Sequence, residues 1–135
     1  MSKEPILETE RLILRPITLD DAKACFSWNS DERVTKYMSY PTLTDISQTI
    51  DWIKSTLTDE KEYNFAFVLK EENKVIGTGS IGPSSKIEGY WGMGYNLHFD
   101  YWHKGYCTEA MKAIIDYVHK KLGLSLIHIS EPTRH

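Results

Sequence analysis

The sequence predicts a single α+β domain with a mainly antiparallel sheet flanked by helices. One strand-like segment comes early, and helical segments follow it. Three strand-like segments then succeed one another across short turns, which favours antiparallel pairing, and a long amphipathic helix comes last. A chain of 135 residues is long enough for one domain with its own core, and no internal repeat or interdomain linker divides it. We therefore expect residues 1–135 to form one domain.

The first half of the chain predicts one strand and three helices. Residues 11–15 resemble a strand that ends at Pro16, and residues 18–21 form an acidic capping box before a helix. In that helix Ala22, Cys25 and Phe26 follow at helical spacing. A short helix after Ser30 is expected to carry Val34 and Tyr37 on one side. A longer one should begin near Thr44, because apolar residues recur at helical spacing, at Ile46, Ile50, Ile53 and Leu57.

The second half predicts a hairpin, a third strand and the long helix. Residues 65–69 and 75–81 resemble two strands joined by the polar turn 71–74. A loop at 84–86 leads to an aromatic-rich strand that runs to about Phe99. The helix is expected over 108–122, where Gly123 can end it. Its buried face is predicted to hold Met111, Ile114, Ile115, Val118 and Leu122.

The composition excludes several classes of protein. Hydrophobic residues make up 41% and charged residues 26%, which is typical of a soluble domain. The net charge of -3 and the pI of about 5.9 argue against a general nucleic-acid binder. No apolar run approaches the roughly 20 residues of a membrane helix. The first residues lack the apolar stretch of a signal peptide, so we expect a cytosolic protein.

The sequence predicts neither a metal site nor a dinucleotide-binding fold. Cys25 and Cys107 lie far apart and the histidines show no zinc-binding spacing, so we expect reduced thiols and no metal. Residues 77–82 match the pattern G-x-G-x-x-G, but Pro83 and a polar loop follow where a dinucleotide site needs a helix. These glycines therefore predict a bulge or close packing within a strand.

The loop before the last helix is the candidate binding site. Residues 101–110 contain a strand end, a single glycine and a helix start in immediate succession. The first N–H groups of a helix lack internal partners and bind anions such as phosphate. Gly105 would let the backbone approach such an anion, and Thr108 would cap the helix or donate a hydroxyl proton. A plain strand-to-helix turn is the simpler alternative.

Residues 93–97 and 100–110 together resemble the coenzyme A motif of the GNAT acetyltransferases. The opening segment, residues 8–16, is similar to the start of the ribosomal-protein alanine N-acetyltransferase branch. The resemblance spans roughly residues 6–124 and implies direct acetyl transfer from acetyl-coenzyme A to a primary amine. Backbone groups near Leu97 and Phe99 would then bind the pantetheine arm. The pyrophosphate would lie on the loop formed by His103, Lys104, Gly105, Tyr106, Cys107 and Thr108.

Several residues depart from the family pattern. Trp102 stands where the wider superfamily prefers Gln or Arg, and Cys107 replaces a usual Gly or Ala. A helix N-terminus can lower a thiol pKa, so a nucleophilic Cys107 is a second interpretation beside a tolerated small side chain. Relatives often carry a carboxylate at the position of Gly92, so Glu88, four residues upstream, is the candidate catalytic base. An exposed loop carboxylate is the alternative.

The family fold continues beyond the long helix with further strands that this sequence does not resemble. We expect residues 1–124 to be native-like, 125–135 to be an artefactual tail, and the sheet to lack its last strands. A strand edge left open in this way would favour a homodimer. Two alternatives to an enzyme stay open, a non-catalytic module that binds coenzyme A and an unrelated interaction domain. A protein N-terminus, a polyamine, an amino sugar and an antibiotic are all acceptable amines.

Overall fold

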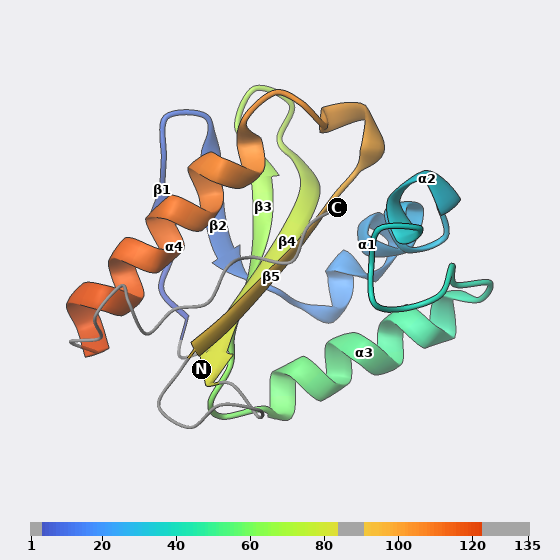
Figure 1. Cartoon of the computed structure of the whole chain (residues 1–135), viewed down its shortest axis with the longest axis horizontal. Coiled ribbons are helices and arrows are strands. Elements are labelled where there is room, and N and C mark those ends of the chain that lie inside the picture. Colours follow the sequence, from blue (N-terminus) through green and yellow to red (C-terminus); the bar gives the residue numbers. More distant parts are fainter. Residues whose placement is uncertain (1–3, 84–90, 123–135) are drawn as a thin grey trace.

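A computed structural model describes residues 4–83 and 91–122 of the chain. Five strands form one antiparallel sheet in the order β1-β2-β3-β4-β5. The strands are β1 (Leu7–Glu8), β2 (Leu12–Pro16), β3 (Tyr63–Leu69), β4 (Lys74–Pro83) and β5 (Trp91–Leu97) (Figure 1). The α+β prediction is confirmed, and β1 is a short strand that the sequence did not predict. Glu88 and residues 125–135 lie outside the described residues.

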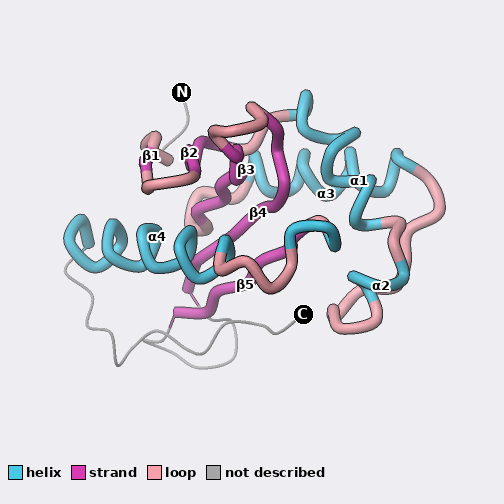
Figure 2. The backbone as a smooth tube through the Cα atoms, turned by 90° about the horizontal axis from the view of Figure 1, so that it is seen from above, coloured by secondary structure: helices cyan, strands magenta, loops and turns pink. Residues whose placement is uncertain are grey.

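Helices cover both faces of this sheet. They are η1 (Leu19–Asp21), α1 (Ala22–Asn29), α2 (Glu32–Thr35), α3 (Ile46–Thr58), η2 (Phe99–Tyr101) and α4 (Tyr106–Leu122). The view from above shows α4 on one side of the strands and α1 with α3 on the other (Figure 2). Among the described helices, none combines the length and the apolarity needed to cross a membrane.

The face under α4 is the main apolar core. Phe65, Phe67 and Leu97 of the sheet are fully buried or nearly so, as are Met111 and Ile114 of α4. The predicted face of the long helix is thus confirmed for Met111, Ile114 and Val118, while Ile115 packs at its margin.

The glycines of β4 serve this packing. A Cβ placed on Gly79 would lie 2.5 Å from Phe67 Cζ and 2.8 Å from the Met111 sulfur. On Gly77 it would lie 2.5 Å from the carbonyl oxygen of Asn96. Residues 77–82 lie inside one strand, β4, so close packing, as expected, accounts for the G-x-G-x-x-G match.

The prediction for α3 is only partly correct. Ile53 is buried, but Ile46 and Leu57 are 38% and 49% exposed. The buried positions beside Ile53 are Thr49 and Thr56. The Asn29 amide of α1 donates a 3.0 Å hydrogen bond to Thr49 Oγ1, and the Thr56 hydroxyl donates to the Ile53 carbonyl of its own helix at 2.8 Å. The spacing of apolar residues cannot predict a buried helix position whose side chain is a hydrogen-bonded polar group.

The start of the first helical segment is as expected, whereas the end of the second is not. The Thr18 backbone N–H donates to an Asp21 carboxylate oxygen at 2.8 Å, and Arg15 holds both oxygens of this buried carboxylate at 2.8 and 2.9 Å. Tyr37 lies beyond the end of α2 and is 51% exposed, so it does not share the buried side of Val34.

Candidate active site

The loop that precedes α4 has an unusual backbone. His103 has φ of 63° and Gly105 has φ of 81°, so two residues in the left-handed region flank Lys104. Glycine adopts this region without cost, whereas histidine does so at some expense, and such strain gathers at functional sites. The helix begins at Tyr106, two residues earlier than expected, so Thr108 lies inside its first turn and is not the cap.

Residues of the turn between β1 and β2 hold this loop in place. Glu109, in the first turn of α4, accepts hydrogen bonds from the Arg11 backbone N–H at 2.9 Å, Arg11 Nε at 2.7 Å and the Thr9 hydroxyl at 2.5 Å. Arg11 Nη1 also donates to the carbonyl of Lys104 at 3.0 Å, and its guanidinium lies 4.3 Å from the centre of the Tyr106 ring. We call Thr9, Arg11 and Glu109 the loop clamp.

Opposing effects act on the Glu109 carboxylate. Burial raises its pKa, but the hydrogen bonds from Thr9 and Arg11 and the Arg11 charge together outweigh that effect and leave the pKa below its ordinary value. The carboxylate is therefore charged at neutral pH, where it also suits the positive end of the α4 dipole.

The six predicted loop residues divide into two groups. His103, Lys104, Gly105 and Thr108 are exposed, whereas Tyr106 is buried and Cys107 half-buried against the core. Desolvation raises the pKa of the Cys107 thiol to about 12, so it is protonated at neutral pH. A protonated thiol is a weak nucleophile, so the structure disfavours the catalytic interpretation of Cys107.

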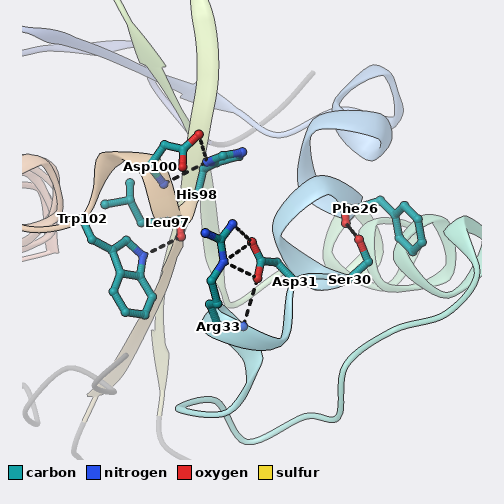
Figure 3. A network of polar contacts seen from close by, with 8 residues as sticks. All are labelled: Phe26, Ser30, Asp31, Arg33, Leu97, His98, Asp100 and Trp102. Atoms are coloured by element: carbon teal, nitrogen blue, oxygen red, sulfur yellow. Dashed lines mark hydrogen bonds and ion pairs between the residues drawn. The ribbon is translucent and has the colours of Figure 1, made fainter.

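The end of β5 leads directly to this loop. Trp102 Nε1 donates a 2.8 Å hydrogen bond to the carbonyl of Leu97 (Figure 3), and the Trp102 backbone N–H donates to the carbonyl of Phe99 at 3.1 Å. Phe99 lies in η2, so the strand ends at Leu97 and not at Phe99 as expected. The unusual Trp102 thus has a role in shaping this corner.

The helical α1–α2 segment is fastened to the same corner. Arg33 forms a 2.7 Å ion pair with Asp31 (Figure 3), and its guanidinium lies 4.1 Å from the centre of the Phe99 ring. The side-chain hydrogen bond from Arg33 lowers the pKa of Asp31 despite partial desolvation. His98 Nδ1 accepts a hydrogen bond from the Asp100 N–H at 3.2 Å and completes the turn.

A pocket of about 310 Å³ lies between the sheet and the α1–α3 side of the molecule. Its polar lining residues are Asn29, Ser39, Tyr40, Gln48, Asn64, Thr78, Ser80, Tyr95 and Asn96. Met38, Leu43 and Trp52 add apolar surface, and among the described residues that line it none carries a charge. The sequence did not predict this pocket, because its walls come from six separate stretches of the chain.

A tyrosine hydroxyl joins the two walls of the pocket. Tyr40 Oη lies 2.9 Å from Asn29 Oδ1 on α1 and 2.7 Å from Asn96 Oδ1 on β5. A hydroxyl has one proton, so it donates to one of these oxygens at a time. Burial raises the pKa of Tyr40 well above its ordinary value, which keeps the proton on the hydroxyl.

Alternating polar residues in the strands could have predicted this pocket. Polar or small residues occupy alternate positions in three neighbouring strands: Asn64 and Ala66, Thr78 and Ser80, Gly94 and Asn96. The register pairs Thr78 with Asn96 and Ser80 with both Asn64 and Gly94, so all six share one face. A polar sheet face normally faces water, but helices cover this one.

Comparison with known proteins gives the family. The sequence model of the acetyltransferase (GNAT) domain matches residues 11–132. An uncharacterized N-acetyltransferase, p20 of Bacillus licheniformis, is 39% identical over 124 residues, which are 90% of this chain and 70% of that protein. The chain belongs to the GNAT acetyltransferase family. Its members transfer an acetyl group from acetyl-coenzyme A to an amine, so an unrelated interaction domain is excluded.

Solved structures share the fold. A GNAT-family acetyltransferase from Bacillus anthracis superposes with a TM-score of 0.77 at 26% identity, over 89% of this chain and 69% of that one. Spermidine N-acetyltransferase from Vibrio cholerae, solved with CoA and spermine, gives 0.72 at 16% identity, over 86% of this chain and 68% of that one. The ribosomal-protein-S5-alanine acetyltransferase from Vibrio fischeri gives 0.67 at 22% identity, over 90% of this chain and 70% of that one, so the ribosomal-protein branch is one of several kinds of neighbour. No group of metal-ligating side chains occurs among the described residues.

Proposed function

We propose that this protein transfers the acetyl group of acetyl-coenzyme A to a primary amine held in the pocket between the sheet and the α1–α3 side. The observation that supports this most is the loop of residues 103–108, with its two left-handed residues at the N-terminus of a 17-residue helix. Such a backbone presents N–H groups to an anion.

The loop residues would divide the binding of the coenzyme. Backbone N–H groups from Gly105 to Thr108 would hold the pyrophosphate, while the exposed Lys104 and His103 side chains lie within the same loop to add donors. Tyr106 and Cys107 would act through their backbone, because their side chains pack in the core. The loop clamp keeps this backbone in position before the coenzyme arrives.

Strand β5 connects the loop to the pocket. Asn96 lines the pocket, and Leu97 ends the strand next to the turn that leads to His103. We propose that the pantetheine arm follows the β5 edge past Leu97 and Phe99 in the manner of an added strand. Their carbonyls already bond Trp102, so backbone N–H groups would be the points of contact.

The transfer itself is a direct displacement. The acceptor ammonium first loses a proton, to water or to a carboxylate such as Glu88. Its nitrogen then forms a C–N bond with the thioester carbonyl carbon while the C–S bond breaks. Sulfur leaves with the electron pair and takes up the proton that the amide nitrogen gives up. The products are an N-acetylated amine and the free thiol of coenzyme A.

The proposal is tested by calorimetric titration of acetyl-coenzyme A into the protein and its Gly105→Val variant. A β-branched residue at φ of 81° is strained, so binding should be lost. Lys104→Ala should weaken binding modestly, whereas Lys112→Ala, an equal loss of charge on the exposed side of α4, should leave it unchanged. Unaltered affinity in Gly105→Val would contradict the assignment of the loop.

A thiol-release assay separates an enzyme from a non-catalytic module that binds coenzyme A. Binding without release of free thiol, over a broad panel of amines, would favour the module. Glu88→Gln tests the candidate base, and we expect at most a weak loss of rate. A cytosolic location, a homodimer and membership of the ribosomal-protein branch stay predictions that fractionation, sedimentation and assays on ribosomal proteins would check.

A further inference from the structure

The floor of the pocket is a polar sheet face that helices cover. Two rows of paired residues cross β3, β4 and β5: Asn64, Ser80 and Gly94 in one, Ala66, Thr78 and Asn96 in the other. Side chains of this kind on a covered face need polar partners, because burying them without one is costly. The part of the chain that the structure describes supplies only some of these partners.

Thr78 shows this most clearly. Its side chain lines the pocket and the residue is only 4% exposed. Within the described part of the chain its hydroxyl has no hydrogen-bond partner, although its neighbour across the strands, Asn96, meets Tyr40. A buried hydroxyl without a partner, on a residue that lines a cavity, can bond a polar group of a molecule that binds there.

The charge of the lining residues indicates which kind of amine the pocket can bind. No carboxylate lines the pocket in the described residues. A polyamine brings several ammonium groups, and removing them from water without an opposite charge is strongly unfavourable. Amide and hydroxyl groups donate and accept at once, which matches the hydroxyls of an uncharged ring. Trp52 adds a flat apolar surface at the edge of the same pocket.

We propose that the acceptor is a small polyhydroxylated amine of the amino-sugar class. Its hydroxyls would bond Thr78, Asn96 and Ser80, and its ring would lie against Trp52. This inference rests on the proposed function, since the same displacement would yield an N-acetylated sugar and free coenzyme A. An amine flanked by oxygen-bearing carbons is less basic than an alkyl amine, so it also needs less help in losing its proton.

The first test is binding, which does not require turnover. D-glucosamine, spermidine and an alanine-starting tetrapeptide are titrated into the full chain by calorimetry, without and with coenzyme A, and D-glucose serves as the ring without the amine. We expect glucosamine to bind at least tenfold more tightly than spermidine, and glucose to retain part of that affinity. Tighter binding of spermidine or of the peptide would overturn the inference.

The second test uses matched variants. Thr78→Val should weaken glucosamine binding by about five- to tenfold, the usual effect of one lost hydrogen bond. Thr78→Ser should retain it, and Thr58→Val, the same exchange at an exposed position of α3, should change nothing. Equal affinity in Thr78→Val and wild type would overturn the inference. Glucosamine binding by a wild-type protein that does not bind acetyl-coenzyme A would instead count against the proposed function.

Discussion

The two faces of the central sheet differ in what they pack against and in what they leave open. Under α4, aromatic and aliphatic side chains fill the space so fully that β4 needs glycine at position 79. Under α1 and α3, the same strands present amides and hydroxyls to a pocket of about 310 Å³. One face is therefore filled for stability, whereas the other carries the proposed recognition surface beside a smaller apolar cluster of α1, α2 and α3. The two faces come from alternate residues of the same strands.

This division explains why the two faces should respond differently to substitution. A side chain in a filled core contributes by transfer from water and by contact, and both are lost when it is removed. A polar group beside a cavity costs the folded protein free energy until a ligand bonds it. Stability and binding can thus be separated experimentally along single strands.

The largest effect on stability is expected on the apolar face. Phe67→Ala removes a fully buried ring and should lower the free energy of unfolding by about 3–5 kcal/mol. Phe67→Leu, which leaves a smaller cavity, should cost distinctly less. Chemical denaturation measures both, and a loss below 1 kcal/mol for Phe67→Ala would show that this face is not the main core.

A smaller loss is expected from adding atoms to that face. Gly79→Ala places a methyl group against Phe67 and Met111 and should destabilise the protein by about 1–3 kcal/mol. Ser80→Ala, one residue away on the polar face, should change stability by less than about 0.5 kcal/mol. Thermal unfolding of the pair checks this, and equal effects would erase the distinction between the faces.

A variant of the loop clamp tests how strongly α4 is held to the turn between β1 and β2. Glu109→Gln should cost about 1 kcal/mol, since its charged hydrogen bonds are partly exposed. The folded-state pKa of Glu109 is lowered, so its contribution is complete above the unfolded value near pH 4.3 and is lost as the pH falls through the folded pKa. Stability measured from pH 7 to pH 3 should fall less steeply in the variant, and parallel curves would contradict this.

The smallest effect is expected on the polar face. Thr78→Val removes a buried hydroxyl that lacks a partner in the described residues, so stability should stay within about 1 kcal/mol of wild type or rise slightly. Denaturation midpoints provide the measurement. A loss above 2 kcal/mol would mean that the hydroxyl is a structural group and not part of a binding surface.

Sequence reasoning reached the elements whose burial is apolar. The stripe of Met111, Ile114 and Val118 predicted α4 well, because that helix packs on aliphatic and aromatic side chains. It was only partly right for α3, where Ile53 is buried and Ile50 packs beside its cluster, but Thr49 and Thr56 are buried and Ile46 is exposed. Hydrophobic periodicity measures transfer from water and does not register a polar pair between helices.

The candidate site was likewise predictable only where its signal is local in the sequence. The loop at Gly105 was predictable because a glycine and a helix start are adjacent in the sequence. The pocket was not, because Asn29, Tyr40 and Asn96 meet only after the chain has folded. The loop clamp was likewise hidden, although its two halves lie in the segments that carried the family resemblance.

The loop clamp also bears on when the protein becomes functional during its synthesis. Arg11 and Glu109 are 98 residues apart in the sequence. At about 5–20 residues per second, a ribosome needs roughly 5–20 seconds to deliver the second partner after the first. Throughout that interval the first strands have no α4 to cover them. A nascent chain that stalls before Glu109 would expose that apolar face to chaperones, so translation speed through the middle of the gene is expected to influence the yield of folded protein.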